Sequence, residues 1–216
     1  MPFPADLIQG AQAQQNADEF SPFIDSLKKE WPSLRDHDFY ISRGKPREEG
    51  GTYSEFYPPW ERDNPSGVNG MPHIEIYDQK FQGQDLRELI AGEMLHYLGS
   101  IDPRTQTAVD PHFRTLKQIF TQSLTPQQWA FERNRYTDLL QSKSPEAVNG
   151  DGEIRPFEDY LDMRSDAYIR GGLLPAINPE WQAPGVYTDE QELIFLEMQK
   201  SLMTPRKKKK MSEYSL

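Results

Sequence analysis

The segment from residue 85 to residue 98 constrains the fold most, because apolar side chains cover more than half of its helical circumference. These apolar residues are Leu86, Leu89, Ile90, Met94, Tyr97 and Leu98. Asp85 predicts an N-cap for this helix, and Gly99 predicts its end. A helix that is apolar on so many sides must pack against more than one neighbour.

Three short strands are predicted before this helix, at residues 38–43, 52–57 and 73–78. The last of them alternates most clearly, with Ile74 and Ile76 on one face and His73 on the other. The charged, glycine-containing segment from Gly44 to Gly51 is typical of a long hairpin loop between the first two strands. These patterns predict a small antiparallel sheet.

Several more helices are predicted from capping residues. A polar residue followed by proline marks three helix starts, at Ser21-Pro22, Asp110-Pro111 and Thr125-Pro126. Another helix is expected from Pro156 to Arg170, closed by Gly171-Gly172. Thr188 and Gln191 predict a capping box at the start of the last helix. The order of the elements indicates an α+β fold, with helices packed on the small sheet.

The composition is lean in apolar residues for a self-contained domain. Hydrophobic residues make up 36% of the 216 residues, and 18 residues are prolines. Such a chain favours a modest core with irregular arms that gain order on a partner. We therefore expect an extended arm at residues 1–20, a domain at 21–172, and a C-terminal part at 173–216 with an arm, a helix and a basic tail.

Glu93 and His96 form the pattern with the most specific chemistry. In the motif H-E-x-x-H, two histidines one helical turn apart bind Zn²⁺, and the glutamate polarises the metal-bound water. Here the glutamate and the second histidine are present, but Gly92 occupies the first position. Because glycine has no side chain, a metal at this place lacks one of its ligands. We therefore interpret Glu93 and His96 as a vestigial catalytic pair.

The layout of residues 70–175 resembles that of zincin-like metallopeptidases, in which a strand precedes the motif helix and a later helix brings the third ligand. Residues 157–175 are similar to the third-ligand helix and the Leu-Leu-x-Pro ending of ImmA/IrrE-like peptidases. The resemblance implies a zincin-like core over residues 21–172. Arg164 falls where those peptidases have an acidic ligand, which is a second departure from an active site.

Three interpretations of Glu93 and His96 stay open at this point. In the first interpretation, the two residues are a structural pair on a zincin-derived scaffold, and the imidazole is the partner that a buried carboxylate requires. In the second, they are a coincidental pair three residues apart on a helix. In the third interpretation a zinc site is retained, and His73, Asp162 or Asp166 completes it together with His96. We favour the first interpretation and expect no cofactor; zinc is the cofactor only in the third.

The net charge of −10 is unevenly distributed. Residues 206–210 are five consecutive basic residues, so that residues 206–216 carry a net charge of +4 and residues 1–205 a net charge of −14. An acidic body does not suit contacts with phosphate groups. Nucleic acid is therefore expected as a partner only through the basic tail, if at all.

Further features restrict the classes of protein. The chain has no cysteine, which excludes disulfides and thiolate metal ligands. No apolar run approaches the roughly 20 residues that a membrane span requires. Residues 1–6 lack the basic and apolar regions of a signal peptide.

These features favour a non-catalytic structural protein that binds other protein subunits of an assembly. The segments at residues 123–126 and 166–171 resemble uncharacterised virion-associated proteins of tailed bacteriophages, which implies a location in the virion or in the cytoplasm of the infected cell. The alternative is an active zinc metallopeptidase that uses Glu93 and His96. A third hypothesis is a small regulator whose acidic body mimics nucleic acid.

Overall fold

The computed structural model describes residues 19–44, 54–60, 71–77, 83–144, 146–148, 152–174 and 183–205. Most of the expected N-terminal arm, most of the expected loop from Gly44 to Gly51 and the basic tail at 206–210 lie outside these residues. The predicted α+β class is confirmed, because a small sheet is combined with several helices.

The chain is divided into two compact units. The first contains Met1–Tyr97 together with Lys200–Leu216, and the second contains Leu98–Gln199. The boundaries fall within helix α2 (Gly83–Gly99) and near the end of helix α6 (Asp189–Met203). The expected organisation into two arms and a domain at 21–172 stays a prediction.

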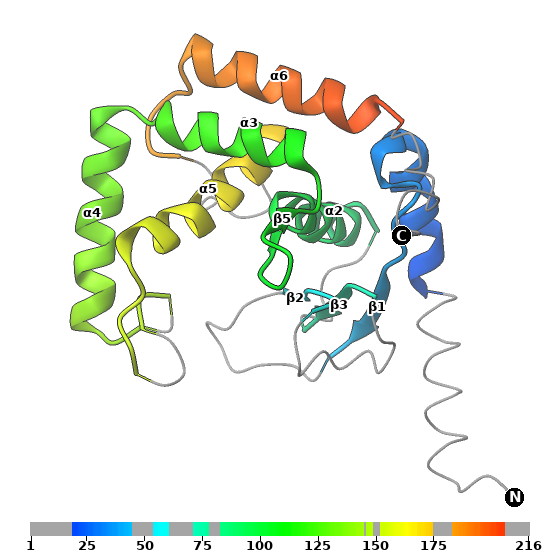
Figure 1. Cartoon of the computed structure of the whole chain (residues 1–216), viewed down its shortest axis with the longest axis horizontal. Coiled ribbons are helices and arrows are strands. Elements are labelled where there is room, and N and C mark those ends of the chain that lie inside the picture. The colour runs from blue at the N-terminus through cyan, green and yellow to red at the C-terminus, as the bar shows by residue number, and fades with distance from the viewer. Residues whose placement is uncertain are drawn as a thin grey trace, which may run out of the picture. The chain divides into compact units, whose positions relative to one another are not determined.

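The sheet of the first unit has β3 (His73–Ile76) in its centre, between β1 (Tyr40–Arg43) and β2 (Ser54–Tyr57) (Figure 1). β1 runs parallel to β3, and β2 runs antiparallel to it. The sheet is therefore mixed, and the predicted hairpin between the first two strands is wrong. The central position suits β3 because Ile74 and Ile76 are fully buried. The connection between β1 and β2 is long, and a long connection does not require the two strands that it joins to pair with each other.

Apolar side chains from both the helices and the sheet form the core of the first unit. A helix at residues 19–30 and the short 3₁₀ helix η1 (Pro32–Leu34) precede the sheet, and α2 follows it. The apolar residues predicted for α2 are all buried. The core also includes Phe20, Leu27, Leu34, Ile41, Ile74 and Ile76. Burial of each such side chain contributes about 1.5–3 kcal/mol.

The second unit is mainly helical. A small hairpin of β4 (Ile101–Asp102) and β5 (Thr107–Ala108) precedes α3 (Pro111–Gln122), α4 (Pro126–Gln141) and α5 (Phe157–Leu173). Helix α5 contacts both α3 and α4 (Figure 1). Most of α6 also belongs to this unit, because Phe195 packs against Phe120 of α3. The C-terminal helix is therefore part of a compact unit over most of its length.

The predicted caps of three helices are confirmed. Asp110 accepts hydrogen bonds from the backbone N–H groups of His112 and Phe113, at 3.0 Å each. Thr125 and Gln128 form a reciprocal capping box at the start of α4. Thr188 and Gln191 make the same pair of bonds before α6. These caps satisfy N–H groups that have no partner within the helix.

Two predicted helix starts and one predicted helix end are wrong. Ser21 lies inside a helix that already includes residue 19, and α2 begins at Gly83, so Asp85 stands in its first turn rather than at its cap. Gly171-Gly172 does not close α5, which continues to Leu173. Gly172 has a packing role instead, because a Cβ atom there would lie 2.3 Å from the ring of Phe195.

Candidate functional site

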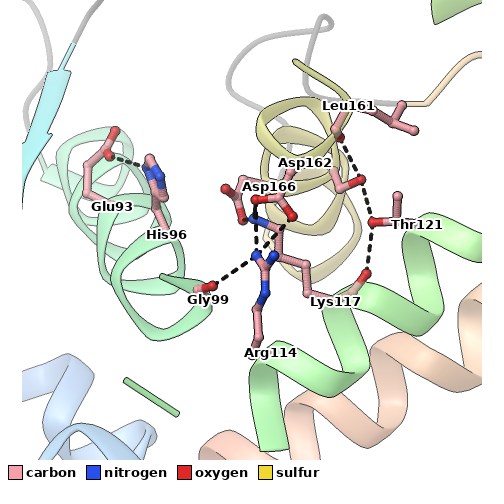
Figure 2. A network of polar contacts seen from close by, with 10 residues as sticks. Glu93, His96, Gly99, Arg114, Lys117, Thr121, Leu161, Asp162 and Asp166 are labelled. Carbon is pink, nitrogen blue, oxygen red and sulfur yellow. Dashed lines mark hydrogen bonds and ion pairs between the residues drawn. The ribbon is translucent and has the colours of Figure 1, made fainter. Parts of the chain in front are cut away.

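Glu93 lies on α2 in the first unit with its carboxylate engaged on both oxygens. The side chain of Ser54 in β2 donates a 2.6 Å hydrogen bond to Oε1. Nδ1 of His96 lies 3.8 Å from Oε2. Figure 2 marks this contact with a dashed line. Glu93 is only 5% exposed, and a carboxylate at such a depth requires partners of this kind. The pairing of Glu93 with His96 proposed from the sequence is therefore present in the structure.

His96 lies at the margin of the same helix face. Its side chain is 41% exposed, and its ring lies 5.5 Å from that of Phe56 in β2. One turn earlier, Gly92 is buried and offers no ligand. Within the described part of the chain, no group of three His, Asp or Glu side chains is arranged to hold a metal ion.

His73 does not lie on the side of the sheet that faces Glu93. Its cross-strand partner is Tyr57, whereas Ser54 and Phe56 are the cross-strand partners of Ile76 and Ile74. Cross-strand partners share a face and successive residues alternate between faces. His73 therefore points away from Glu93 and His96, and it cannot complete a metal site with them.

Asp162 and Asp166 lie on α5 in the second unit, where both carboxylates contact positively charged side chains (Figure 2). Nζ of Lys117 is 2.9 Å from Asp162 and 2.7 Å from Asp166. Arg114 lies 2.9 Å from Asp162 and also donates to the carbonyl oxygen of Gly99. Burial raises the pKa of Asp162, but Lys117 and Arg114 outweigh it, so the pKa lies below its usual range. These positive charges oppose the binding of a metal ion at the two carboxylates.

Arg164, which stands where ImmA/IrrE-like peptidases have an acidic ligand, also has a partner close by. It is buried on α5, and its Nε lies 3.3 Å from both carboxylate oxygens of Glu132 on α4. Tyr160 donates a 2.6 Å hydrogen bond to the same carboxylate. Burial and this hydrogen bond raise the pKa of Tyr160, which keeps it a donor. Arg164 thus holds α5 on α4.

A polar cluster on the other face of the sheet was not predicted from the sequence. Ser42 and Nε2 of His73 are 2.7 Å apart, and the ring of Tyr57 is stacked on the imidazole. Tyr77 donates a 2.9 Å hydrogen bond to Glu75. The strand register explains why these residues meet, because Ser42 is the partner of Glu75 and Tyr57 that of His73. The register itself could not be read from the residues.

The Ser42–His73 pair has the donor–acceptor contact of a nucleophile and its base, but not the other parts of a catalytic site. His73 is only 2% exposed, so a substrate cannot reach its ring. Its Nδ1 atom is buried and has no hydrogen-bond partner in the described structure. A general base needs a third group at this atom to fix its orientation. The pair is therefore a structural contact.

The burial of His73 makes the stability depend on pH. Burial lowers the pKa of His73 from 6.5 to about 4. Between these pH values His73 is protonated in the unfolded chain but stays neutral in the folded chain. The free energy of unfolding therefore falls as the pH falls from about 6.5 to about 4. The expected loss from this group is about 3 kcal/mol. Urea unfolding at pH 7 and pH 4, followed by tryptophan fluorescence, measures it.

The variant His73→Phe keeps an aromatic ring under Tyr57 but cannot be protonated. We expect its stability to depend less on pH over the same interval, even if it is less stable than the natural protein at pH 7. The remaining residues are the same in both proteins, so that their contributions cancel in the comparison. Equal pH dependences in the two proteins would show that His73 is not the titrating group.

No protein-family model, curated protein or solved structure matches the chain. None of the helices in the described part of the chain combines the length and apolar character needed to cross a bilayer.

Proposed function

We propose that the protein is a non-catalytic structural and interaction protein, a component of a tailed-phage particle, built on a degenerate zinc-peptidase-like scaffold. The observation that supports this proposal most strongly is the environment of the Glu93 carboxylate. Its carboxylate is buried and bound by Ser54 and His96. In this role the two residues of the motif stabilise the contact of α2 with the sheet.

The contrast with a working peptidase supports this role. There, the glutamate must reach a water molecule on zinc, and three protein side chains must hold the metal. Here a hydroxyl group donates to Glu93, and His73 lies on the other face of the sheet. Asp162 and Asp166 bind Lys117. Each candidate for the missing ligand thus has a different local role.

Zinc content tests the loss of the metal site. We expect the purified protein, dialysed against zinc and then freed of unbound metal, to hold clearly less than one equivalent. The reason is that Gly92 removes one imidazole and no candidate replaces it. Elemental analysis gives the stoichiometry. A full equivalent that is lost in His96→Ala would overturn the proposal and favour the metallopeptidase.

The ancestry of the scaffold has its own test. The variant Gly92→His restores two imidazoles one turn apart on α2. We expect zinc to bind this variant and to raise its melting temperature, whereas Gly92→His with His96→Ala gains neither property. A folded Gly92→His variant without zinc binding would count against a zincin-derived scaffold, whatever the zinc content of the natural protein.

Membership of a particle is tested by sedimentation. The resemblance of residues 123–126 and 166–171 to virion-associated proteins supports this part of the proposal. When the chain is expressed during infection by the phage that encodes it, we expect it to sediment with intact particles in a density gradient. A protein that stays at the top of the gradient, while capsid and tail proteins sediment, would contradict it.

A further inference from the structure

One buried glutamine side chain joins the capping box of α6 to that of α4. Gln191 is completely buried in the second unit, and its Nε2 atom donates a 2.9 Å hydrogen bond to Oε1 of Gln128. The same nitrogen lies 3.2 Å from the carbonyl oxygen of Ser123, the residue that caps the end of α3. The end of α3 and the starts of α4 and α6 therefore meet at Gln191 (Figure 1).

The two capping boxes fix the orientation of both amide groups. The backbone N–H of Thr188 can only donate, so Oε1 of Gln191 must face it, at 3.1 Å. The Nε2 atom of Gln191 is then left to donate to Gln128 and Ser123. In the same way, the backbone N–H of Thr125 donates to Oε1 of Gln128 at 2.9 Å. This oxygen therefore accepts one hydrogen bond from each of the two capping boxes.

The closed junction also contains an unfavourable group. Gln128 is only 1% exposed, and its Nε2 atom is buried with no hydrogen-bond partner in the described structure. A buried donor without an acceptor opposes the folded arrangement. An opening at this point returns the amide group to water, so it requires less free energy than the opening of a fully hydrogen-bonded junction.

We propose that Gln191 acts as a lock, through which the starts of α4 and α6 open and close as a single unit. When Gln191 leaves the junction, Oε1 of Gln128 loses one of its two donors, and the capping box of α4 is weakened although no residue of α4 has changed. When Gln128 leaves, the buried Nε2 atom of Gln191 loses an acceptor. The inference goes beyond the proposed function, because it depends neither on zinc nor on a phage particle.

The variant Gln191→Glu separates the lock from the local cap. Glutamate is a usual residue at this position of a capping box, and it keeps an oxygen for the N–H of Thr188. Its carboxylate has no hydrogen to donate to Gln128 or to the end of α3. We expect the backbone N–H groups of Thr125 and Gln128 to exchange with deuterium at least about tenfold faster in this variant. Hydrogen exchange resolved by residue in NMR spectra measures these rates.

Two controls distinguish release of the lock from a general loss of stability. Gln199→Glu is the same change at an exposed position of α6 and should alter the rates of Thr125 and Gln128 by less than about twofold. The N–H of Tyr136, in the second half of α4, is the internal reference. Unchanged rates at Thr125 and Gln128 in folded Gln191→Glu, or an equal acceleration at Tyr136, would overturn the proposal.

The reciprocal variant Gln128→Leu removes the acceptor on α4 and leaves α6 unchanged. We expect the N–H groups of Thr188 and Gln191 to exchange at least about tenfold faster in this variant. Gln141→Leu, the same change at an exposed position of α4, is the control. Far-UV circular dichroism identifies the folded variants, and only these are compared. Acceleration that stays confined to α4 would contradict the lock.

The natural protein provides a test that needs no variant. The N–H groups of Thr125, Gln128, Thr188 and Gln191 should show the same dependence of exchange on low concentrations of urea, because one opening exposes all four. Different dependences for the pair on α4 and the pair on α6 would show two independent openings, and the proposal would then be wrong.

Discussion

Replacing Glu132 with alanine is expected to lower the free energy of unfolding by about 3–5 kcal/mol, the typical cost of removing one partner from a buried ion pair. Glu132 is completely buried on α4. Its carboxylate accepts a hydrogen bond from Tyr160 and lies against Nε of Arg164. Alanine leaves the buried guanidinium without this carboxylate, and it also leaves the phenol without its acceptor. Equilibrium unfolding in urea measures the loss.

Two further variants separate the charge from the hydrogen bond. Glu132→Gln keeps an oxygen that can accept from Tyr160 but removes the negative charge beside Arg164, so we expect a smaller loss of about 1–3 kcal/mol. Asp138→Ala changes an exposed carboxylate on the same helix and should alter the stability by less than about 0.5 kcal/mol. A loss of under 1 kcal/mol in Glu132→Ala would show that the network contributes little to the stability.

The parts of the fold that were predictable from the sequence are those decided by neighbouring residues. The caps at Asp110, Thr125 and Thr188 join groups only two or three residues apart. A side chain with the right length and a following N–H group are sufficient for such a bond, so the residues alone indicate it. The burial of α2 was predictable for the same reason, because its apolar pattern repeats every turn.

The order of the strands was not predictable in this way. The residues of β1 and β2 indicate extended structure, but they do not say which strand lies between the others. That choice depends on the burial of β3 by the rest of the unit, where Ile74 and Ile76 are fully buried. The face on which His73 lies follows from the same pairing. The sequence therefore suggested His73 as a ligand that the register rules out.

The candidate site was also predictable only in part, because some of its contacts are local and others join distant residues. The spacing of Glu93 and His96 indicated their proximity, since residues three apart lie on one face of a helix. The second partner of Glu93 is Ser54, which is 39 residues away in the chain. Arg164 could be recognised as a departure from an acidic ligand, but its partner Glu132 lies on another helix. Such distant partners of buried charges require the tertiary structure.

Substitution of Lys117 is the second change with a large expected effect, because this lysine joins α3 to α5 from a buried position. Its side chain is 2% exposed, and Nζ lies 2.7 Å from Asp166 and 2.9 Å from Asp162. We expect Lys117→Met to lower the free energy of unfolding by about 3 kcal/mol. Methionine retains an apolar chain of similar length, so the loss reports mainly on the missing charge. Asp162 keeps its contact with Arg114, whereas Asp166 loses its 2.7 Å contact with Lys117.

A double-mutant cycle isolates that effect. Asp166→Leu alone should also destabilise the protein, since it removes a carboxylate from the buried ammonium group. Lys117→Met combined with Asp166→Leu should cost at least 1 kcal/mol less than the sum of the single changes, because apolar side chains then replace both charges. Gln118→Ala, an exposed change next to Lys117 on α3, is the control and should be nearly neutral. Additive losses in the cycle would show that Lys117 and Asp166 do not stabilise each other.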